Sequence, residues 1–431
     1  MSIHIQNVLG LFHETDRGFF TRKTDVYIVD GKIIGIDSPP EGFISKRQID
    51  GEGKLLIPGF INSHTHVPMT ILRNAADDLK FHEWLFGRIL PLEDKLTPED
   101  CYWGAQLGIM EMLRTGTTCF LDMYFNIDQV AQAVYDTKMR AVLSCSVMDS
   151  VEGVDGKALL KEAEEIITRW RGKGNLDLML APHAAYTCAP DYQREVAKTA
   201  KELGVGLHTH ISESVREVED IYAQYGKSPV ELMAETGLLT DRTVAAHCVH
   251  LSEMDILTLA KHGVHVAHNP ISNLKLANGV APVPKLRAAG VNVCLGTDGT
   301  ASNNTLNMFG ELKQACLLHK GISGDPEAVT ASEGLELATI NGARALGLDG
   351  VIGKLVVGYD ADLVLLSLDH PNMQPQNDLV SALAYATSGH EVELTMVKGE
   401  VLYENGRFPT IDTERVYQEI EQICKKIGLR D

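Results

Sequence analysis

Eight short apolar runs alternate with stretches of helical periodicity between Pro58 and about residue 346. Strands that alternate with helices are typical of a parallel sheet, and eight such units are typical of a (β/α)8 barrel. The eight runs are LIPGFINSHTH, TTCFLDMYF, RAVLSCSVMDS, LDLMLAPH, GVGLHTHISES, TVAAHCVH, GVHVAHNP and NVCLGTDG. We therefore predict an α/β fold with a TIM-like (β/α)8 barrel over residues 58–346.

The two ends of the chain carry a different pattern. Residues 1–57 contain short alternating segments with turn signals, among them a hairpin candidate around Asp30-Gly31. After residue 350 the alternation returns in GKLVVGYDADLVLLSL and VELTMVKGEVLYENG, and TERVYQEIEQICKKIG has helical periodicity. A chain of 431 residues has room for one barrel of roughly 250 residues and a smaller module. We predict that residues 1–57 and 347–431 pair into one discontinuous β-sandwich domain with a C-terminal helix.

Composition excludes several classes of function. The formal net charge is −19 and no basic stripe is present, so we expect no nucleic-acid partner. No signal peptide and no run of roughly 20 apolar residues is found, which predicts a cytoplasmic protein without a membrane partner. The eight cysteines are scattered without a C-x-x-C pair, so buried free thiols are expected rather than disulfides or a thiolate metal site. We also expect a homo-oligomer.

Polar residues stand at the C-terminal ends of the predicted strands. Taken alone, each of these residues could equally have a structural role, as a hydrogen-bonded interior histidine or a helix-capping aspartate. Chance is nevertheless a poor explanation for the common register, and in barrels of this kind the active site lies on that face. The residues are His64 and His66 on the first strand, His183 on the fourth, His210 with Glu213 on the fifth, His247 on the sixth and Asp298 on the eighth.

Imidazole and carboxylate ligands without thiolate suit Zn²⁺ or Fe²⁺, and a catalytic site keeps one position for water. His64 and His66 are separated by one residue, so they leave the same side of a strand. We predict one divalent ion per chain, with Zn²⁺ favoured and Fe²⁺ or Mn²⁺ as alternatives. His208 competes with His210, because strand alternation places both on one face and only the position near the strand end favours His210. The expected ligands are His64, His66, His210 and Asp298.

Three residues suit proton transfer beside such an ion. A catalytic metal lowers the pKa of water towards about 7, and attack on an electron-poor carbon then needs a base and an acid. Asp298 is expected to take the proton of the water, and His247 to orient that water. Glu213, three residues past a ligand histidine, is placed to protonate a ring nitrogen.

Several stretches resemble the amidohydrolase superfamily, and in particular its 5-methylthioadenosine/S-adenosylhomocysteine deaminase family. They are PGFINSHTH, HTHISES, AAHCVHL, HNPISNLKLANGVAPV and LGTDGTASNN. The resemblance covers nearly the whole chain and implies a single metal on the residues that match His64, His66, His210 and Asp298. Members with two metals bridge them through a carboxylated lysine on the fourth strand, and DLMLAPH offers no lysine there. A mononuclear site is therefore expected.

The resemblance also implies substrate contacts. The stretch FHEWLFGRILPLED matches a substrate loop in which Trp84 and Glu93 contact a nucleoside, with Glu93 accepting the ribose hydroxyls. From the residue types alone, we would expect Trp84 to be a core residue and Glu93 to be a charge exposed to solvent. His183 matches a further contact. Cys145 stands where members that accept S-adenosylhomocysteine well have an arginine, so we expect uncharged 5′ substituents to be preferred.

These observations predict a metal-dependent hydrolytic deaminase of adenine nucleoside derivatives such as 5′-methylthioadenosine, 5′-deoxyadenosine and adenosine, with S-adenosylhomocysteine as a further substrate that these three outrank. Its products are the inosine derivative and ammonia. An alternative within the superfamily is a hydrolase of guanine, cytosine or an s-triazine, which lacks a ribose for Glu93 to bind. A further alternative is a noncatalytic metal-stabilised binding protein, which leaves Glu213 and His247 unexplained.

Overall fold

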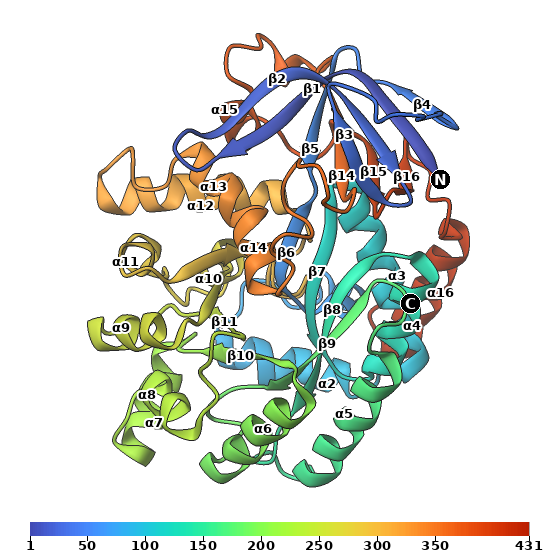
Figure 1. Ribbon diagram of the computed structural model, residues 1–431. Helices are drawn as coiled ribbons and strands as arrows, with labels where there is room; N and C mark the ends of the chain where they lie inside the picture. The colour runs from blue at the N-terminus through green and yellow to red at the C-terminus, as the bar shows by residue number, and fades with distance from the viewer. Residues whose placement is uncertain (431) are drawn as a thin grey trace.

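The computed structural model describes residues 1–430 and contains the expected barrel (Figure 1). Its eight strands lie in sequence order, and each neighbouring pair from β6 to β13 is parallel. The strands are β6 Phe60–Thr65, β7 Thr117–Tyr124, β8 Arg140–Val147, β9 Leu176–Pro182, β10 Gly206–Ile211, β11 Thr243–His247, β12 His265–His268 and β13 Asn292–Leu295. All eight predicted runs therefore form strands, and the predicted fold class is confirmed.

The last and first strands lie side by side where the barrel closes. The amide of Asp298 donates to the carbonyl oxygen of His64 at 2.9 Å, and the amide of Thr297 donates to Asn62 Oδ1 at 2.9 Å. Gly296 permits this approach, because a Cβ at that position would lie 2.7 Å from the amide nitrogen of His64. The ends of β6 and β13 are thus held together at the C-terminal mouth of the barrel.

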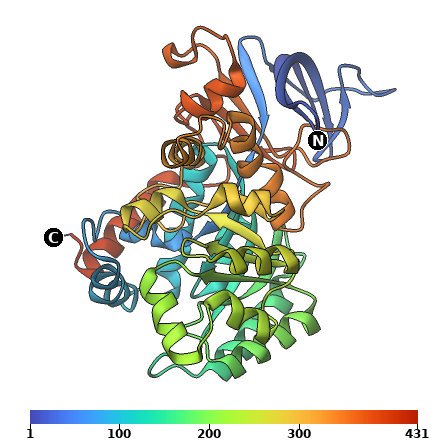
Figure 2. The same cartoon turned by 90° about the vertical axis from the view of Figure 1, so that its left-hand side faces the viewer.

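Helices cover the outer face of the barrel (Figures 1 and 2). Several begin at a side-chain cap, for example Thr97, Ser228, Ser252 and Thr330, each paired with an acidic residue three positions on. The helices between the first strand and residue 346, including short ones at the mouth of the barrel, are η1 Val67–Leu72, α1 Phe81–Trp84, η2 Leu85–Ile89, α2 Leu90–Glu93, α3 Pro98–Arg114, α4 Ile127–Thr137, α5 Gly156–Trp170, α6 Pro190–Leu203, α7 Val215–Tyr225, α8 Pro229–Thr236, α9 Glu253–His262, α10 Pro270–Lys275, α11 Val283–Ala288, α12 Met308–Ser323, α13 Ala331–Ala338 and α14 Ile340–Ala345. Within residues 1–430, no helix combines the length and apolarity needed to cross a bilayer.

Both chain ends contribute to a second sheet. Its order is β16-β15-β14-β5-β1-β2-β3, with β4 paired to β1. Its strands are β1 Ser2–Glu14, β2 Gly18–Val29, β3 Lys32–Ile36, β4 Arg47–Asp50, β5 Lys54–Pro58, β14 Leu363–Ser367, β15 Val392–Val397 and β16 Glu400–Glu404. Side chains from the two ends share one hydrophobic cluster, with Ile3 and Val26 from one end and Leu363 and Met396 from the other. The exact boundaries of this domain, at residues 57 and 347, remain a prediction.

Two smaller expectations concern the chain ends. The hairpin at Asp30-Gly31 is present, and both residues have positive φ angles, of 48° and 84°. The C-terminal helix is α16 Thr413–Ile427, and it packs on α3 of the barrel, where Lys426 pairs with Asp100. Between β14 and β15 lie η3 Pro371–Met373 and α15 Leu379–Tyr385. The terminal helix therefore covers the barrel wall rather than the second sheet.

A buried ion pair joins the second sheet to the N-terminal end of the barrel. Arg140, the first residue of β8, donates to Asp362 Oδ2 at 2.8 Å and to Asp360 Oδ2 at 2.8 Å. The arginine side chain is 9% exposed, and those of the two aspartates are 5% and 1% exposed. Burial opposes ionisation of Asp360, but Lys32 and Arg140 hold its pKa below the ordinary value. Removing the arginine would leave the buried Asp362 without its cationic partner and Asp360 with Lys32 alone.

We expect Arg140→Ala to lower the free energy of unfolding by about 3–5 kcal/mol, because breaking a buried ion pair strands the remaining charge. Chemical denaturation followed by circular dichroism measures the change. Arg194→Ala is the matched control, since Arg194 pairs with Asp191 on the surface and its loss should cost no more than about 1 kcal/mol. Equal effects of the two substitutions would contradict a joining role for Arg140.

Candidate metal centre and adjoining cleft

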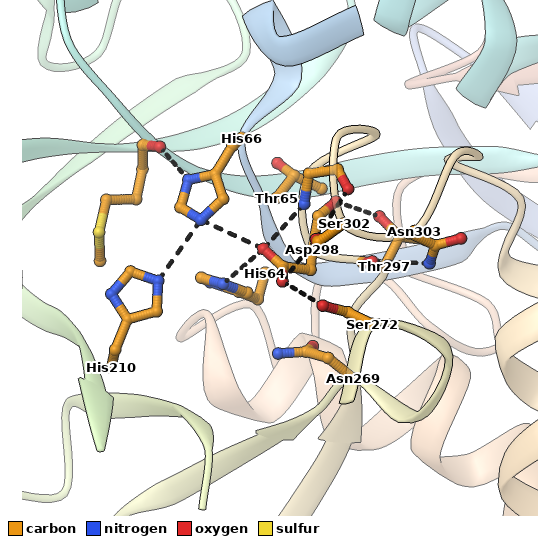
Figure 3. Close-up of polar contacts among 12 residues, drawn as sticks. His64, Thr65, His66, His210, Asn269, Ser272, Thr297, Asp298, Ser302 and Asn303 are labelled. Atoms are coloured by element: carbon orange, nitrogen blue, oxygen red, sulfur yellow. Dashed lines mark hydrogen bonds and ion pairs between the residues drawn. The ribbon is translucent and has the colours of Figure 1, made fainter. Parts of the chain in front are cut away.

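Four side chains meet at the C-terminal mouth of the barrel (Figure 3). Asp298 Oδ1 lies 3.4 Å from His64 Nε2 and 3.2 Å from His66 Nε2. His66 Nε2 lies 3.4 Å from His210 Nε2. Nitrogen and oxygen atoms that converge at these separations can share one cation, since zinc ligand bonds are about 2.0–2.2 Å long. The buried Nε2 of His64 has no hydrogen-bond partner, as expected of an atom that faces a cation.

The other ring nitrogen of each histidine is held from behind. His66 Nδ1 lies 2.6 Å from the carbonyl oxygen of Met123, and His210 Nδ1 lies 2.9 Å from that of His183. A carbonyl oxygen only accepts, so Nδ1 carries the proton and Nε2 presents its lone pair to the centre. Burial lowers the pKa of His64 to about 3 and that of His210 well below its ordinary value, which keeps both in the neutral form that binds metals. The donor set therefore fits a divalent metal ion.

His208 and His210 differ in depth rather than in direction. Both project into the barrel from β10, as strand alternation requires. His208 lies deeper: its Nε2 is 2.8 Å from His64 Nδ1, and its Nδ1 is 3.0 Å from Ser144 Oγ. His208 therefore supports a ligand from behind, while His210 reaches the centre itself.

Asp298 is held in a left-handed backbone conformation, with φ of 62°. Its Oδ2 accepts hydrogen bonds from Ser272 Oγ at 2.6 Å and from Ser302 Oγ at 2.9 Å, which leaves Oδ1 to face the histidines. Burial alone would raise the pKa of Asp298, but His64 and His66 hold it well below the ordinary value. The carboxylate is thus ionised and oriented.

A second carboxylate faces the same centre from the loop after β10. Glu213 Oε1 accepts a hydrogen bond from Asn278 Nδ2 at 2.9 Å, and its Oε2 lies 3.8 Å from His247 Nε2. Asn273 Oδ1 holds His247 through Nδ1 at 2.8 Å. Burial raises the pKa of Glu213, which favours a protonated side chain that can donate to a ligand.

Glu217 shapes the loop that carries Glu213. Its carboxylate accepts hydrogen bonds from the amides of Ser212 and Glu213, at 2.9 and 2.8 Å. Ser212 has a positive φ of 52°, so the loop turns sharply directly after β10. The carboxylate in the first turn of α7 thereby fixes the direction in which Glu213 points.

An open cleft of about 670 Å³ lies over the metal centre. The predicted contacts Trp84, Glu93 and His183 all line it. Trp84 is 6% exposed and donates to the carbonyl oxygen of Ala301 at 3.2 Å. Glu93 Oε1 accepts the hydroxyl of Tyr124 at 2.6 Å, and burial raises the pKa of Glu93 to about 7. Burial also lowers the pKa of His183 to about 4.

Cys145 lies outside this cleft, in contrast to the expected substrate contact. Along β8, Ser144 contacts His208 and Ser146 lines the cleft, so the inner face of the strand carries the even-numbered residues. Cys145 points to the other face and lines a hollow beside α4 and α5, which adjoins the cleft at Tyr124, Phe125 and Ser146. The family resemblance located the strand correctly, but the alternation of side chains along β8 points Cys145 away from the cleft, so its expected role as a substrate contact is not supported.

Several residues that hold the side chains of the site in place were not predicted from the sequence. Ser272, Asn273 and Asn278 lie in HNPISNLKLANG, a stretch that carries the family resemblance but contains no ionisable group other than its histidine and lysine. Tyr124 occupies the last position of β7, where a barrel places functional groups, and that position was the available signal. Glu217 gave no signal, because an acidic residue in a first helical turn is ordinary.

Comparisons with known proteins agree with this geometry. Residues 55–402 match the family model described as the amidohydrolase family. A 5-methylthioadenosine/S-adenosylhomocysteine deaminase from Caldanaerobacter subterraneus subsp. tengcongensis is 45% identical over 429 residues, covering 99% of each chain. A solved adenosine deaminase from Xanthomonas campestris with bound zinc is 34% identical, covers 99% of each chain and superposes with a TM-score of 0.95. An atrazine chlorohydrolase from Arthrobacter aurescens complexed with zinc is 26% identical, covers 98% of this chain and 99% of its own, and has a TM-score of 0.90.

We expect Asp298→Ala to abolish retention of the divalent metal, because it removes the only carboxylate among the four converging side chains. Elemental analysis of the purified protein after dialysis measures the metal content. His183→Ala is the control, since its imidazole lines the same cleft and its backbone carbonyl still holds His210. Full metal content in Asp298→Ala, or equal loss in both variants, would contradict this assignment.

Proposed function

The chain belongs to the amidohydrolase family, and we propose that it is a hydrolytic deaminase of adenine nucleosides. The reaction exchanges the exocyclic amine of the purine for oxygen from water and releases ammonia and the inosine derivative. The observation that carries the proposal is the arrangement of Glu213, His247 and Asp298 around one metal centre beneath a cleft that Glu93 lines. An acid, a base and a group for a sugar are thus present together.

The proposed cofactor is one zinc ion per chain, held by His64, His66, His210 and Asp298. A divalent ion supplies an activated water at neutral pH, because it lowers the pKa of water to about 7. Zinc is supported by this donor set of three imidazoles and one carboxylate, and by the zinc in two similar solved proteins.

Each polar group then has a distinct proposed role. Glu213 delivers a proton to the purine ring nitrogen next to the reacting carbon, which makes that carbon more electrophilic. Asp298 accepts the proton of the attacking water and passes it to the leaving amine. His247, fixed by Asn273, orients the water by a hydrogen bond. The protons balance: one hydrogen of water leaves with ammonia through Asp298, and the other returns to Glu213 when the new C–O bond becomes a carbonyl, replacing the proton that stays on the ring nitrogen.

Glu93 favours a nucleoside over a free heterocycle. Its Oε1 is engaged by Tyr124, and Oε2 remains to accept a ribose hydroxyl. A guanine, cytosine or s-triazine substrate has no sugar and would leave Oε2 of this half-buried carboxyl without a partner from the substrate, which carries a desolvation cost. Trp84 and His183 would complete the wall around the nucleoside. The homo-oligomeric state remains a prediction.

A substrate panel tests the proposal. The zinc-loaded protein is incubated with adenosine, 5′-methylthioadenosine, 5′-deoxyadenosine, adenine, guanine, cytosine and an s-triazine, and released ammonia or chloride is measured. Ammonia from the adenine nucleosides is expected, with little from the free bases. Turnover of a free base or triazine well above that of every nucleoside would favour the alternative hydrolases, and no turnover of any compound would favour a binding protein.

We expect Glu213→Gln to retain zinc but to lower kcat about 100-fold or more, because an amide cannot donate an acidic proton to the ring. Steady-state kinetics with adenosine and elemental analysis of the same sample measure both quantities. Glu219→Gln, an exposed change on helix α7, which directly follows the Glu213 loop, is the matched control and should leave kcat unchanged. A raised KM with normal kcat in Glu213→Gln would reduce Glu213 to a binding residue.

A further inference from the structure

A second hollow opens from the cleft on the side away from the metal centre. It measures about 1340 Å³, part of it open to solvent. The two cavities share Glu93, Tyr124, His183 and Tyr186, so the hollow begins where the ribose is proposed to lie. The hollow does not include Glu213, His247 or Asp298 in its wall. A molecule that fills the cleft and extends further therefore enters this space.

The wall of the hollow is apolar with acidic groups at its edge. Apolar side chains come from the segment around η2 and from the loop between β8 and α5, namely Phe86, Leu96, Met148, Val151 and Val154. The acidic residues outside the cleft are Asp94 and Glu152, both exposed. No lysine or arginine lines the hollow among residues 1–430. The surface thus suits an uncharged group and offers a carboxylate no cationic partner.

We propose that this hollow receives the 5′ substituent of the nucleoside and selects extended apolar substituents over those that end in a carboxylate. The inference rests on the proposed deaminase function and names the substrate class of the same site. The wall of the hollow, rather than Cys145, then determines which 5′ substituent is accepted, because the side chain of Cys145 faces another cavity.

The position of the hollow follows from the positions of the polar groups. A nucleoside whose base reaches Glu213 and whose ribose hydroxyls reach Glu93 fills the cleft over the metal centre. A group attached to the 5′ carbon has to leave the cleft past the ribose. The hollow begins at the residues around the ribose and continues between Leu96 and Met148, so it lies in the path of that group.

The size of the expected preference follows from burial. Each methylene that leaves water favours binding by about fourfold, so three further methylenes should give a clear gain even if burial is incomplete. We expect kcat/KM for 5′-deoxy-5′-(butylthio)adenosine to exceed that for 5′-methylthioadenosine at least about fivefold. S-adenosylhomocysteine, which has a tail of similar reach with a carboxylate, should fall at least about tenfold below the butylthio compound.

Two substitutions with matched controls test the wall directly in the zinc-loaded protein. Val154→Trp should fill the hollow and lower the ratio of kcat/KM for the butylthio compound to that for adenosine at least about tenfold. Val357→Trp, the same change at an exposed valine of the loop before β14, should keep that ratio within about twofold.

Glu152→Arg should raise the ratio for S-adenosylhomocysteine to adenosine about tenfold or more, as expected for a new charge-assisted hydrogen bond. Glu165→Arg makes the same change of net charge on the exposed face of α5, outside the hollow, and should alter the ratio less than about twofold.

The outcomes separate this inference from the function on which it rests. Turnover of adenosine together with a butylthio compound at least tenfold poorer than 5′-methylthioadenosine would overturn the inference alone. The same holds if S-adenosylhomocysteine matches or exceeds the butylthio compound, or if Glu152→Arg and Glu165→Arg act equally. No ammonia from any compound, adenosine included, would overturn the deaminase proposal and the inference with it.

Discussion

The contact between β13 and β6 closes the barrel and forms the metal centre at the same time. The amide of Asp298 donates to the carbonyl oxygen of His64, so the backbone bond that joins the two strands also places the carboxylate beside the histidines. Asn62 strengthens this junction by binding both the amide and the hydroxyl of Thr297. The absence of a side chain at Gly296 allows the strands to approach. Every proposed role of the site depends on this junction.

The interior of the barrel changes character along its axis. Towards the N-terminal end it holds apolar groups such as Ile61, Val142 and Val244, and the second sheet covers that end. Towards the C-terminal mouth it holds imidazoles with hydrogen bonds to the nitrogens that face away from the centre, and burial keeps those of His64 and His210 neutral. Burying so many polar rings is costly unless each is satisfied, and a cation satisfies the remaining lone pairs. The metal is thus expected to stabilise the fold as well as to support chemistry.

We expect substrate specificity to reside in the wall of the cleft rather than in the metal centre. A zinc-bound adenosine deaminase and a zinc-bound atrazine chlorohydrolase both superpose on this chain over nearly their whole length. Similar barrels therefore serve different leaving groups, and the surrounding segments decide which substrate is held. Here those segments are the turns after β6, which supply Trp84 and Glu93, and the loop after β8, which borders the adjoining hollow.

The sequence by itself determined the order of strands and helices and the strand ends at which polar groups stand, because hydrophobic period and chain order are local properties. It predicted the barrel, the shared sheet of the two ends, and the residues that converge at the mouth. Only the tertiary structure shows that His208 lies deeper in the barrel than His210. Both side chains leave the same face of one strand and differ only in their distance from the metal centre. The tertiary structure also decided that Cys145 faces away from the cleft and that Glu217 holds the loop of Glu213. These features depend on which parts of distant segments meet in space, and no local pattern in one chain records that.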